Sequence, residues 1–239
     1  MKKKYNAFTL AEVLITLGII GVVAALTMPT LINNHRSHAL KASFLKTYST
    51  LASAAELAKN DLSLCSIQEN FSDEFEEAFA KRLQVVDIKT QLRFNNSKFK
   101  TMNYSNTTGF NSCLNIRSNK EYILNNGASY CVRDGGGFGG ADKDLGYVIG
   151  FDTNGPYKGP NRAGYDLFEV RFTDDAIEPY YFTKTLNYCT KTNNPDASGD
   201  WYGTGGGYSH QSNGRFCAYF ALTDVNPDNR NKGYWESLY

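Results

Sequence analysis

The chain has almost no net charge of either sign, with 25 lysines and arginines against 24 aspartates and glutamates in 239 residues. A protein that binds nucleic acid through its overall electrostatic field needs a surplus of basic side chains. Removing Lys2, Lys3 and Lys4, which precede the first apolar run, leaves 22 basic against 24 acidic side chains. The composition therefore indicates no nucleic-acid partner.

Catalytic motifs are also missing. There are three histidines, and only His210 lies beyond the N-terminal region. His35 and His38 are three residues apart but have no neighbouring carboxylate or cysteine, so they make a poor metal site. The sequence contains no G-x-S-x-G and no H-E-x-x-H, and the glycine-rich segments Gly135–Gly140 and Gly203–Gly207 lack the G-K-[ST] ending of a phosphate loop. We therefore predict that the protein is not an enzyme.

The cysteines lack the C-x-x-C spacing of a zinc or thioredoxin-like site. All five lie in the water-facing part of the chain: Cys65, Cys113, Cys131, Cys189 and Cys217. This distribution favours an oxidising compartment. Proximity in the sequence suggests disulfides Cys113–Cys131 and Cys189–Cys217, each worth about 3 kcal/mol. Cys65 would then be free or intermolecular, although spacing alone leaves other pairings open.

The sequence has one long apolar run. Phe8 to Met28 contains a single charged residue, Glu12, and as a helix it would span about 30 Å, the thickness of a bilayer core. The three preceding lysines predict a cytoplasmic N-terminus. A secretory signal peptide usually has an apolar core of about 7–15 residues followed by a small residue at the cleavage site. Here the small residue, Ala7, comes before the run, so we expect a membrane helix.

Glu12 requires an explanation because a carboxylate near the end of a membrane helix costs a few kcal/mol unless it has a partner or reaches the headgroups. One interpretation is that the side chain extends to the headgroups. In the other, a cut between Ala7 and Phe8 creates a positive α-amine one helical turn from Glu12. A packed neighbour could then supply the counter-charge.

The run K-K-K-Y-N-A followed by F-T-L-A-E-V-L-I-T-L-G-I-I-G-V-V-A-A-L resembles the leader and N-terminal helix of type IV prepilins, the family that includes the type II secretion pseudopilins. The match covers roughly Lys2 to Ile32. The resemblance implies cleavage after Ala7 by a membrane-embedded prepilin peptidase, N-methylation of Phe8, and use of Glu12 in subunit registration. The family usually has glycine before the cut, where this chain has Ala7.

Pro29 also matches the family's placement of a proline in the protruding helix. Proline removes a backbone donor and clashes with the preceding turn, so it allows a kink, or alternatively ends the helix. Beyond it, residues Ser37–Asn60 carry apolar side chains at steps of three and four: Leu40, Phe44, Tyr48, Leu51, Ala52 and Ala55. This spacing predicts an amphipathic helix that covers a sheet.

The remaining sequence predicts a small antiparallel sheet with long loops. A second helix is expected at Asp73–Leu83, where Asp73 and Glu76 have capping-box spacing. Strand-like runs occur at Tyr122–Leu124, Tyr147–Phe151, Leu167–Phe172 and Tyr180–Phe182. We predict an α+β fold in which a long N-terminal helix packs on the sheet, the lollipop shape of pilins. The expected divisions are a leader at 1–7, a membrane helix at 8–32, its amphipathic continuation at 33–60 and a globular domain at 61–239.

The loop between Phe151 and Phe168 gathers oxygen-bearing side chains. Asp152, Asn154 and Asp166 could surround a hard cation, which makes calcium the only candidate cofactor. The D-x-N-G-x-x-x-G-P-N portion also looks like a loop found in pseudopilin-like domains. Asx turns explain most of these residues without a metal, and this structural interpretation is preferred.

These features predict a filament subunit, either a type II secretion pseudopilin or a minor pilin. The expected partners are the prepilin peptidase and methyltransferase, other pilin or pseudopilin subunits, an inner-membrane assembly platform and membrane lipid. The chain would stay in the bacterial inner membrane, with its C-terminal domain outside the cytoplasm, until assembly. The alternative is an anchored binding or adhesion protein, for which the aromatic cluster of Trp201, Tyr202, Tyr208 and Tyr219 is a candidate surface or simply part of the core.

Overall fold

The computed structural model describes residues 9–67, 72–90, 92–93, 99–106, 109, 113–115, 120–134, 147–174, 176–179, 189–191, 213–215 and 217–239. Several sequence predictions lie outside these residues. They are the leader with Ala7 and Phe8, the strand at Tyr180–Phe182, the two glycine-rich segments, His210 and the aromatic cluster except Tyr219.

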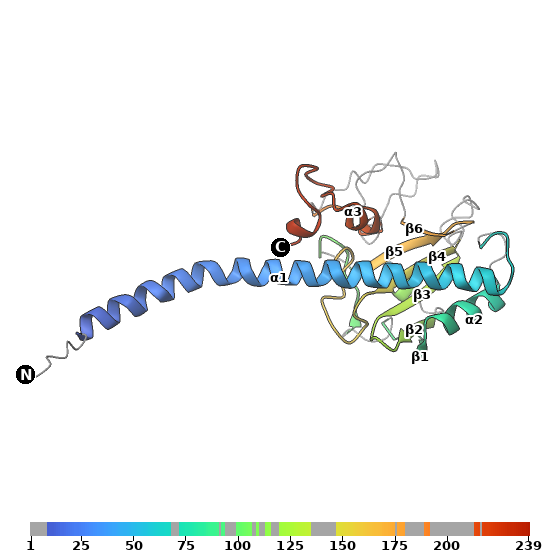
Figure 1. The fold of residues 1–239 in the computed structure, drawn as a ribbon, viewed down its shortest axis with the longest axis horizontal. Helices are drawn as coiled ribbons and strands as arrows, with labels where there is room; N and C mark the ends of the chain where they lie inside the picture. Colours follow the sequence, from blue (N-terminus) through green and yellow to red (C-terminus); the bar gives the residue numbers. More distant parts are fainter. Residues whose placement is uncertain are drawn as a thin grey trace, which may run out of the picture.

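A single helix, α1, runs from Leu10 to Asp61 over 52 residues, about 78 Å at the usual rise. It passes through Pro29 without interruption, so this proline does not end the helix. Figure 1 shows the N-terminal half projecting from the domain along a gentle curve and the C-terminal half lying across the sheet. This arrangement is the predicted lollipop.

The C-terminal half of α1 is amphipathic. Its buried residues are Ser37, Phe44, Thr47, Leu51, Ala54, Ala55 and Ala58. Phe44, Leu51 and Ala55 were predicted for this stripe, whereas Leu40, Tyr48 and Ala52 lie at its margins and are half-buried. Small residues occupy the positions nearest the end of the helix. They let its backbone approach the sheet closely.

Six strands form one antiparallel sheet in sequence order. They are β1 (Val85–Thr90), β2 (Lys120–Leu124), β3 (Ser129–Asp134), β4 (Tyr147–Asp152), β5 (Leu167–Phe172) and β6 (Ile177–Pro179). Three of the predicted strands are present as β2, β4 and β5. Three strands were not predicted: β1, an edge strand that contains Asp87 and Lys89, β3, whose apolar run is only Tyr130–Val132, and the three-residue β6. The α+β fold class is confirmed.

Helix α2 spans Asp73–Arg82, close to its predicted bounds. The predicted cap is wrong by one residue: Ser72 is the N-cap, and its hydroxyl accepts a hydrogen bond from the Phe75 amide at 3.3 Å. Ser72 has the extended backbone that a cap needs, and serine is a favoured residue there. Glu76 does not have the predicted capping role, and its carboxylate accepts a hydrogen bond from the Tyr122 hydroxyl.

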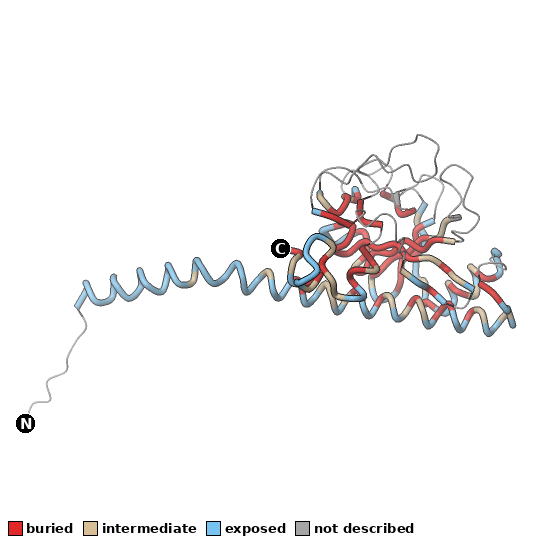
Figure 2. The backbone as a smooth tube through the Cα atoms, turned by 90° about the horizontal axis from the view of Figure 1, so that it is seen from above, coloured by how far each residue is buried: buried red, intermediate tan, exposed pale blue. Residues whose placement is uncertain are grey.

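The main core lies between the helices and one face of the sheet, and much of it is aromatic. Phe44 of α1 packs on Phe168 of β5 with ring centroids 4.4 Å apart. Phe75 and Phe79 of α2 meet Phe172 edge-on at 5.5 and 5.6 Å. The buried residues in Figure 2 are concentrated on this side of α1 and in the sheet, whereas the projecting half of the helix is exposed. The core therefore fixes only the second half of α1.

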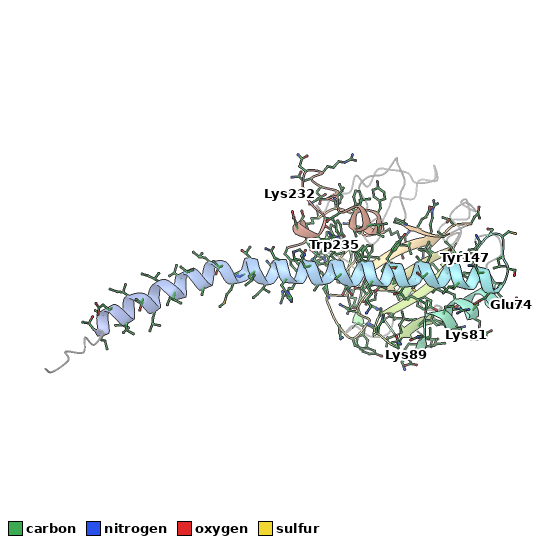
Figure 3. All side chains as sticks on the ribbon, in the orientation of Figure 1. Glu74, Lys81, Lys89, Tyr147, Lys232 and Trp235 are labelled. Atoms are coloured by element: carbon green, nitrogen blue, oxygen red, sulfur yellow. A yellow bond between two sulfur atoms is a disulfide. The ribbon has the colours of Figure 1, made fainter. Side chains whose placement is uncertain are left out.

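The C-terminal segment fastens α1 where it leaves the domain. It contains α3 (Cys217–Thr223) and the short 3-10 helix η6 (Trp235–Ser237). Ser37 donates to the Trp235 carbonyl, and the Lys41 ammonium lies 2.5 Å from the Asp224 carboxylate. Figure 3 shows Trp235 beside α1 at this point. We call this region, where α1 enters the domain, the neck.

Candidate functional site

The candidate site is the start of α1, which Thr9 and Glu12 close as a capping box. Thr9 is the N-cap with extended backbone, and its hydroxyl accepts from the Glu12 amide at 3.3 Å. The Glu12 carboxylate in turn accepts from the Thr9 amide and hydroxyl, each at 2.8 Å. These reciprocal bonds satisfy two backbone donors that the first turn would otherwise leave open. Glu12 is therefore held at the helix start by its own chain.

Glu12 was predicted as a site residue from the sequence, whereas Thr9 was not. The signal was present, because T-x-x-E just before an apolar run is the pattern of a capping box. Predicted cleavage and methylation concern Ala7 and Phe8, which lie outside the described residues. The structure therefore places Glu12 in the first turn of α1, and the roles of Ala7 and Phe8 stay predictions.

Around Glu12 the helix surface is apolar and exposed on all sides. Leu14, Leu17 and Ile20 are 61%, 60% and 63% exposed. Within the described residues, α1 is the one helix long and apolar enough to cross a membrane, and none of that window is buried. No residue between Glu12 and Arg36 carries a formal charge. This half of the helix needs lipid or another protein to cover it.

Two glycines interrupt this apolar surface. A Cβ atom built on Gly18 or Gly21 meets nothing within 4 Å. The isolated chain therefore gives no packing reason for glycine at either position. Small residues on a membrane helix let a second helix approach closely, so these positions are suited to contact with another helix.

Asp152, Asn154 and Asp166, the calcium candidates, are brought together at one end of the sheet. The Asn154 amide nitrogen lies 3.5 Å from Asp166, and the backbone amides of Asn154 and Gly155 donate to Asp152 at 3.1 and 2.8 Å. Asp166 accepts from the backbone amides of Asn161 and Arg162 at 2.8 and 2.7 Å. The loop is thus built on Asx-type turns, as the preferred interpretation expected.

Arg93, which was not predicted as a site residue, brings a positive charge to this loop. Its buried guanidinium lies 2.7 Å from both Asp152 and Glu121 and donates to Asn161 at 2.9 Å. Burial raises the pKa of Asp152, and the Arg93 charge opposes this rise. Burial also raises the pKa of Asp166, to about 8.

A calcium ion would have to share the carboxylates that Arg93 and the backbone amides already occupy. Of the oxygens on the three candidates, the buried Asn154 side-chain oxygen lacks a hydrogen-bond partner. The described residues contain no group of three or more histidine, cysteine, aspartate or glutamate side chains able to hold a metal. The donor set therefore fits a structural loop better than a cation site, and calcium binding stays a prediction.

Both cysteine pairs suggested by the sequence are disulfides in the structure, Cys113–Cys131 and Cys189–Cys217. The first joins the 3-10 helix η2 (Cys113–Asn115) to β3 on the sheet face opposite α1. The second ties α3 to the segment around Thr190. Cys65 is free and exposed, and both disulfides therefore stabilise the globular domain rather than α1.

The comparisons with known proteins address the same N-terminal segment. The family model of the prokaryotic N-terminal methylation motif matches residues 2–28. That range includes the lysines, the predicted cleavage site, Thr9, Glu12 and both glycines of the exposed helix. No curated protein and no solved structure matches the chain. Together, the methylation motif, the long N-terminal helix and the antiparallel sheet support a type IV pilin-like protein.

Proposed function

We propose that this protein is a structural, non-catalytic subunit of a type IV pilus-like filament, a type II secretion pseudopilin or a minor pilin. The observation that carries the proposal is the isolated carboxylate of Glu12 at the start of an exposed apolar helix. In a simple membrane anchor that carboxylate could only cap the helix start, a role that an uncharged residue can fill without the added cost of inserting a charge. A subunit that pairs the charge with a neighbour does gain from it.

Assembly exchanges one apolar environment for another. The exposed side chains of α1 contact lipid while the chain is stored in the membrane, and other α1 helices after assembly. Gly18 and Gly21 leave room for that packing. Glu12 then lies opposite the α-amine of Phe8 in a neighbouring subunit, and pairing offsets the cost of removing both charges from the headgroups.

Processing precedes assembly in this scheme. The prepilin peptidase removes Met1–Ala7 on the cytoplasmic side and methylates the new N-terminus at Phe8. The chain waits in the inner membrane with its domain on the far side, and the assembly platform then adds it to other pilin or pseudopilin subunits. The methylation motif over residues 2–28 supports this order of events.

Intact mass and N-terminal sequencing of the protein recovered from cells test the processing step. We expect a chain that begins at N-methylated Phe8 in cells with the peptidase and at Met1 in cells without it. A chain that begins at Met1 in both strains, or is cut after the apolar run, would contradict the proposal. It would leave a membrane-anchored or secreted binding protein as the better account.

Assembly is tested separately with Glu12→Gln, which removes the charge and keeps the shape. Processing should continue, while the protein disappears from the sheared filament fraction and stays in the membrane. Glu56→Gln is the matched control, because Glu56 is an exposed glutamate of the same helix within the domain. Equal filament yield from both variants would show that Glu12 has no role in assembly.

A further inference from the structure

A groove opens at the neck, between α1 and the loop that follows β4. Arg36, Leu40 and Ser43 of α1 line one side, and Gly159, Pro160 and Tyr239 line the other. The loop is anchored to the helix because the Ser43 hydroxyl donates to the Thr153 carbonyl at 3.1 Å. The groove is therefore part of the folded domain.

The length of the exposed helix places this groove at a membrane surface. Glu12 and Arg36 are the two charges that bound the uncharged stretch of α1. The helix between them is about 36 Å long at 1.5 Å per residue, slightly more than the roughly 30 Å of a bilayer core. When Glu12 lies at one headgroup layer, Arg36 reaches the other.

The side chains at the neck are those that favour the headgroup region. Residues 157–160 are all exposed, and Tyr157 and Tyr239 are 61% and 48% exposed. Tyrosine is enriched at membrane interfaces, where its ring and hydroxyl meet different surroundings. Tyr239 lines the groove itself. Tyr157 lies two residues before Gly159 in the adjoining loop, where its ring meets Phe99 edge-on at 5.3 Å.

The charged side chains at and beside the groove are basic. Arg36 lines it and Lys158 is next to it in the chain, and neither has an ion pair within the described part of the chain. No acidic residue lines the groove. The nearby carboxylates of Asp152 and Asp166 are fully buried and already accept hydrogen bonds from Arg93 and backbone amides. An anionic group entering from the membrane side meets Arg36 in the groove, and the exposed Lys158 lies in the loop beside it.

We propose that the neck groove binds the headgroup of an anionic phospholipid in the membrane that α1 spans. Arg36 and Lys158 contact the phosphate, and Tyr157 and Tyr239 lie in the interfacial layer. Such a contact fixes how the domain sits on the bilayer before assembly, and it is lost when the subunit leaves the membrane. The inference rests on the membrane-anchored state in the proposed function, but on neither cleavage nor Glu12.

The test uses the full chain in lipid nanodiscs of phosphatidylcholine with or without phosphatidylglycerol. Hydrogen exchange of the backbone at residues 153–160 is measured by mass spectrometry, and the lipids retained by the protein are counted by native mass spectrometry. Phosphatidylglycerol should slow exchange in this loop and be retained in preference to phosphatidylcholine. Each basic residue near an anionic surface contributes enough to change that preference about fivefold.

Arg36→Gln and Lys158→Gln should therefore each reduce the preference about fivefold, and the double variant about thirtyfold. Lys81→Gln is the control, since Lys81 is an exposed lysine at the end of the domain away from the projecting helix (Figure 3). Arg36 and Lys158 are exposed, so their loss should leave the thermal unfolding midpoint unchanged.

Three results would overturn the inference. They are equal exchange in the two lipid compositions, an equal loss of preference in Lys81→Gln, and equal protection by inorganic phosphate added to phosphatidylcholine discs, which would identify a free anion as the ligand. Resistance of the chain to carbonate extraction from native membranes is measured alongside. Release of the chain by carbonate would contradict the proposed function. Retention of the chain without any lipid preference would contradict only this inference.

Discussion

The two halves of α1 show how one helix can serve two environments. Leu51 in the second half is fully buried, whereas Leu17 in the first half is 60% exposed, although both are leucines in the same continuous helix. The second half is covered by this chain's own sheet. The first half has to be covered by lipid or by another protein. The second half therefore contributes to folding of the domain, and the first half is available for assembly.

The same contrast applies to charge. Arg93 is buried in the domain and finds Glu121, Asp152 and Asn161 within its own chain. Among the described residues, the Glu12 carboxylate accepts hydrogen bonds from Thr9 and has no oppositely charged partner. A charge whose partners lie in the same chain contributes to folding, whereas a charge without such a partner is available for pairing between chains.

The largest effect should come from Arg93→Gln. It leaves Asp152 and Glu121 buried without their cation, and breaking a buried pair in this way costs about 3–5 kcal/mol. Urea unfolding of the full chain in detergent, followed by far-UV circular dichroism, measures the loss. Glu12→Gln under the same conditions should leave the unfolding midpoint of the domain unchanged. Similar losses in both variants would remove the distinction between the two charges.

Next in size is the matched pair Leu51→Ala and Leu17→Ala. Truncating the buried leucine creates a cavity against the sheet and should lower the free energy of unfolding by about 2–5 kcal/mol. The exposed leucine loses no contact within the chain, so its variant should unfold like the wild type. A comparable loss at Leu17 would mean that the first half of α1 also packs on the domain.

The disulfides should have a smaller effect, again confined to the domain. Replacing both cysteines of either pair with serine should cost about 3 kcal/mol, and slightly more for Cys189–Cys217, which closes the longer loop. Thermal unfolding with and without reductant measures this cost, and Cys65→Ser is the control. Cleavage and membrane retention should not change in either paired variant. A paired variant with wild-type thermal stability would show that its loop is ordered without the bond.

Features formed by residues close together in the sequence could be predicted from it, whereas features formed by residues far apart in the sequence could not. The long apolar helix and the stripe around Phe44 follow from spacing along the chain. Both disulfides join cysteines that are neighbours in the sequence, although spacing alone left other pairings open. Arg93 could not be found in this way, because its partners Glu121 and Asp152 are 28 and 59 residues away and nothing in the local pattern marks it as buried. Strand β1 was missed because pairing with β2, rather than an apolar run, forms it.

Substitution of Thr9 should have the smallest effect on stability, and it tests most directly whether the two halves of α1 are independent. Thr9→Val removes the hydroxyl that accepts from the Glu12 amide, which costs about 1 kcal/mol at a helix start. Because this end of α1 makes no contact with the domain, the cost should appear as local fraying rather than lower domain stability. Amide exchange at Glu12 and Val13, the two first-turn amides that hydrogen-bond to Thr9, is measured by NMR in micelles. It should accelerate about fivefold at that energy, while Thr9→Ser should behave as wild type. Thr9→Val leaves the Glu12 charge in place and only frees it from its own chain. It should therefore reduce filament yield less than Glu12→Gln, which removes the charge. If Thr9→Val instead lowers the domain's unfolding midpoint, the two halves of α1 are energetically coupled.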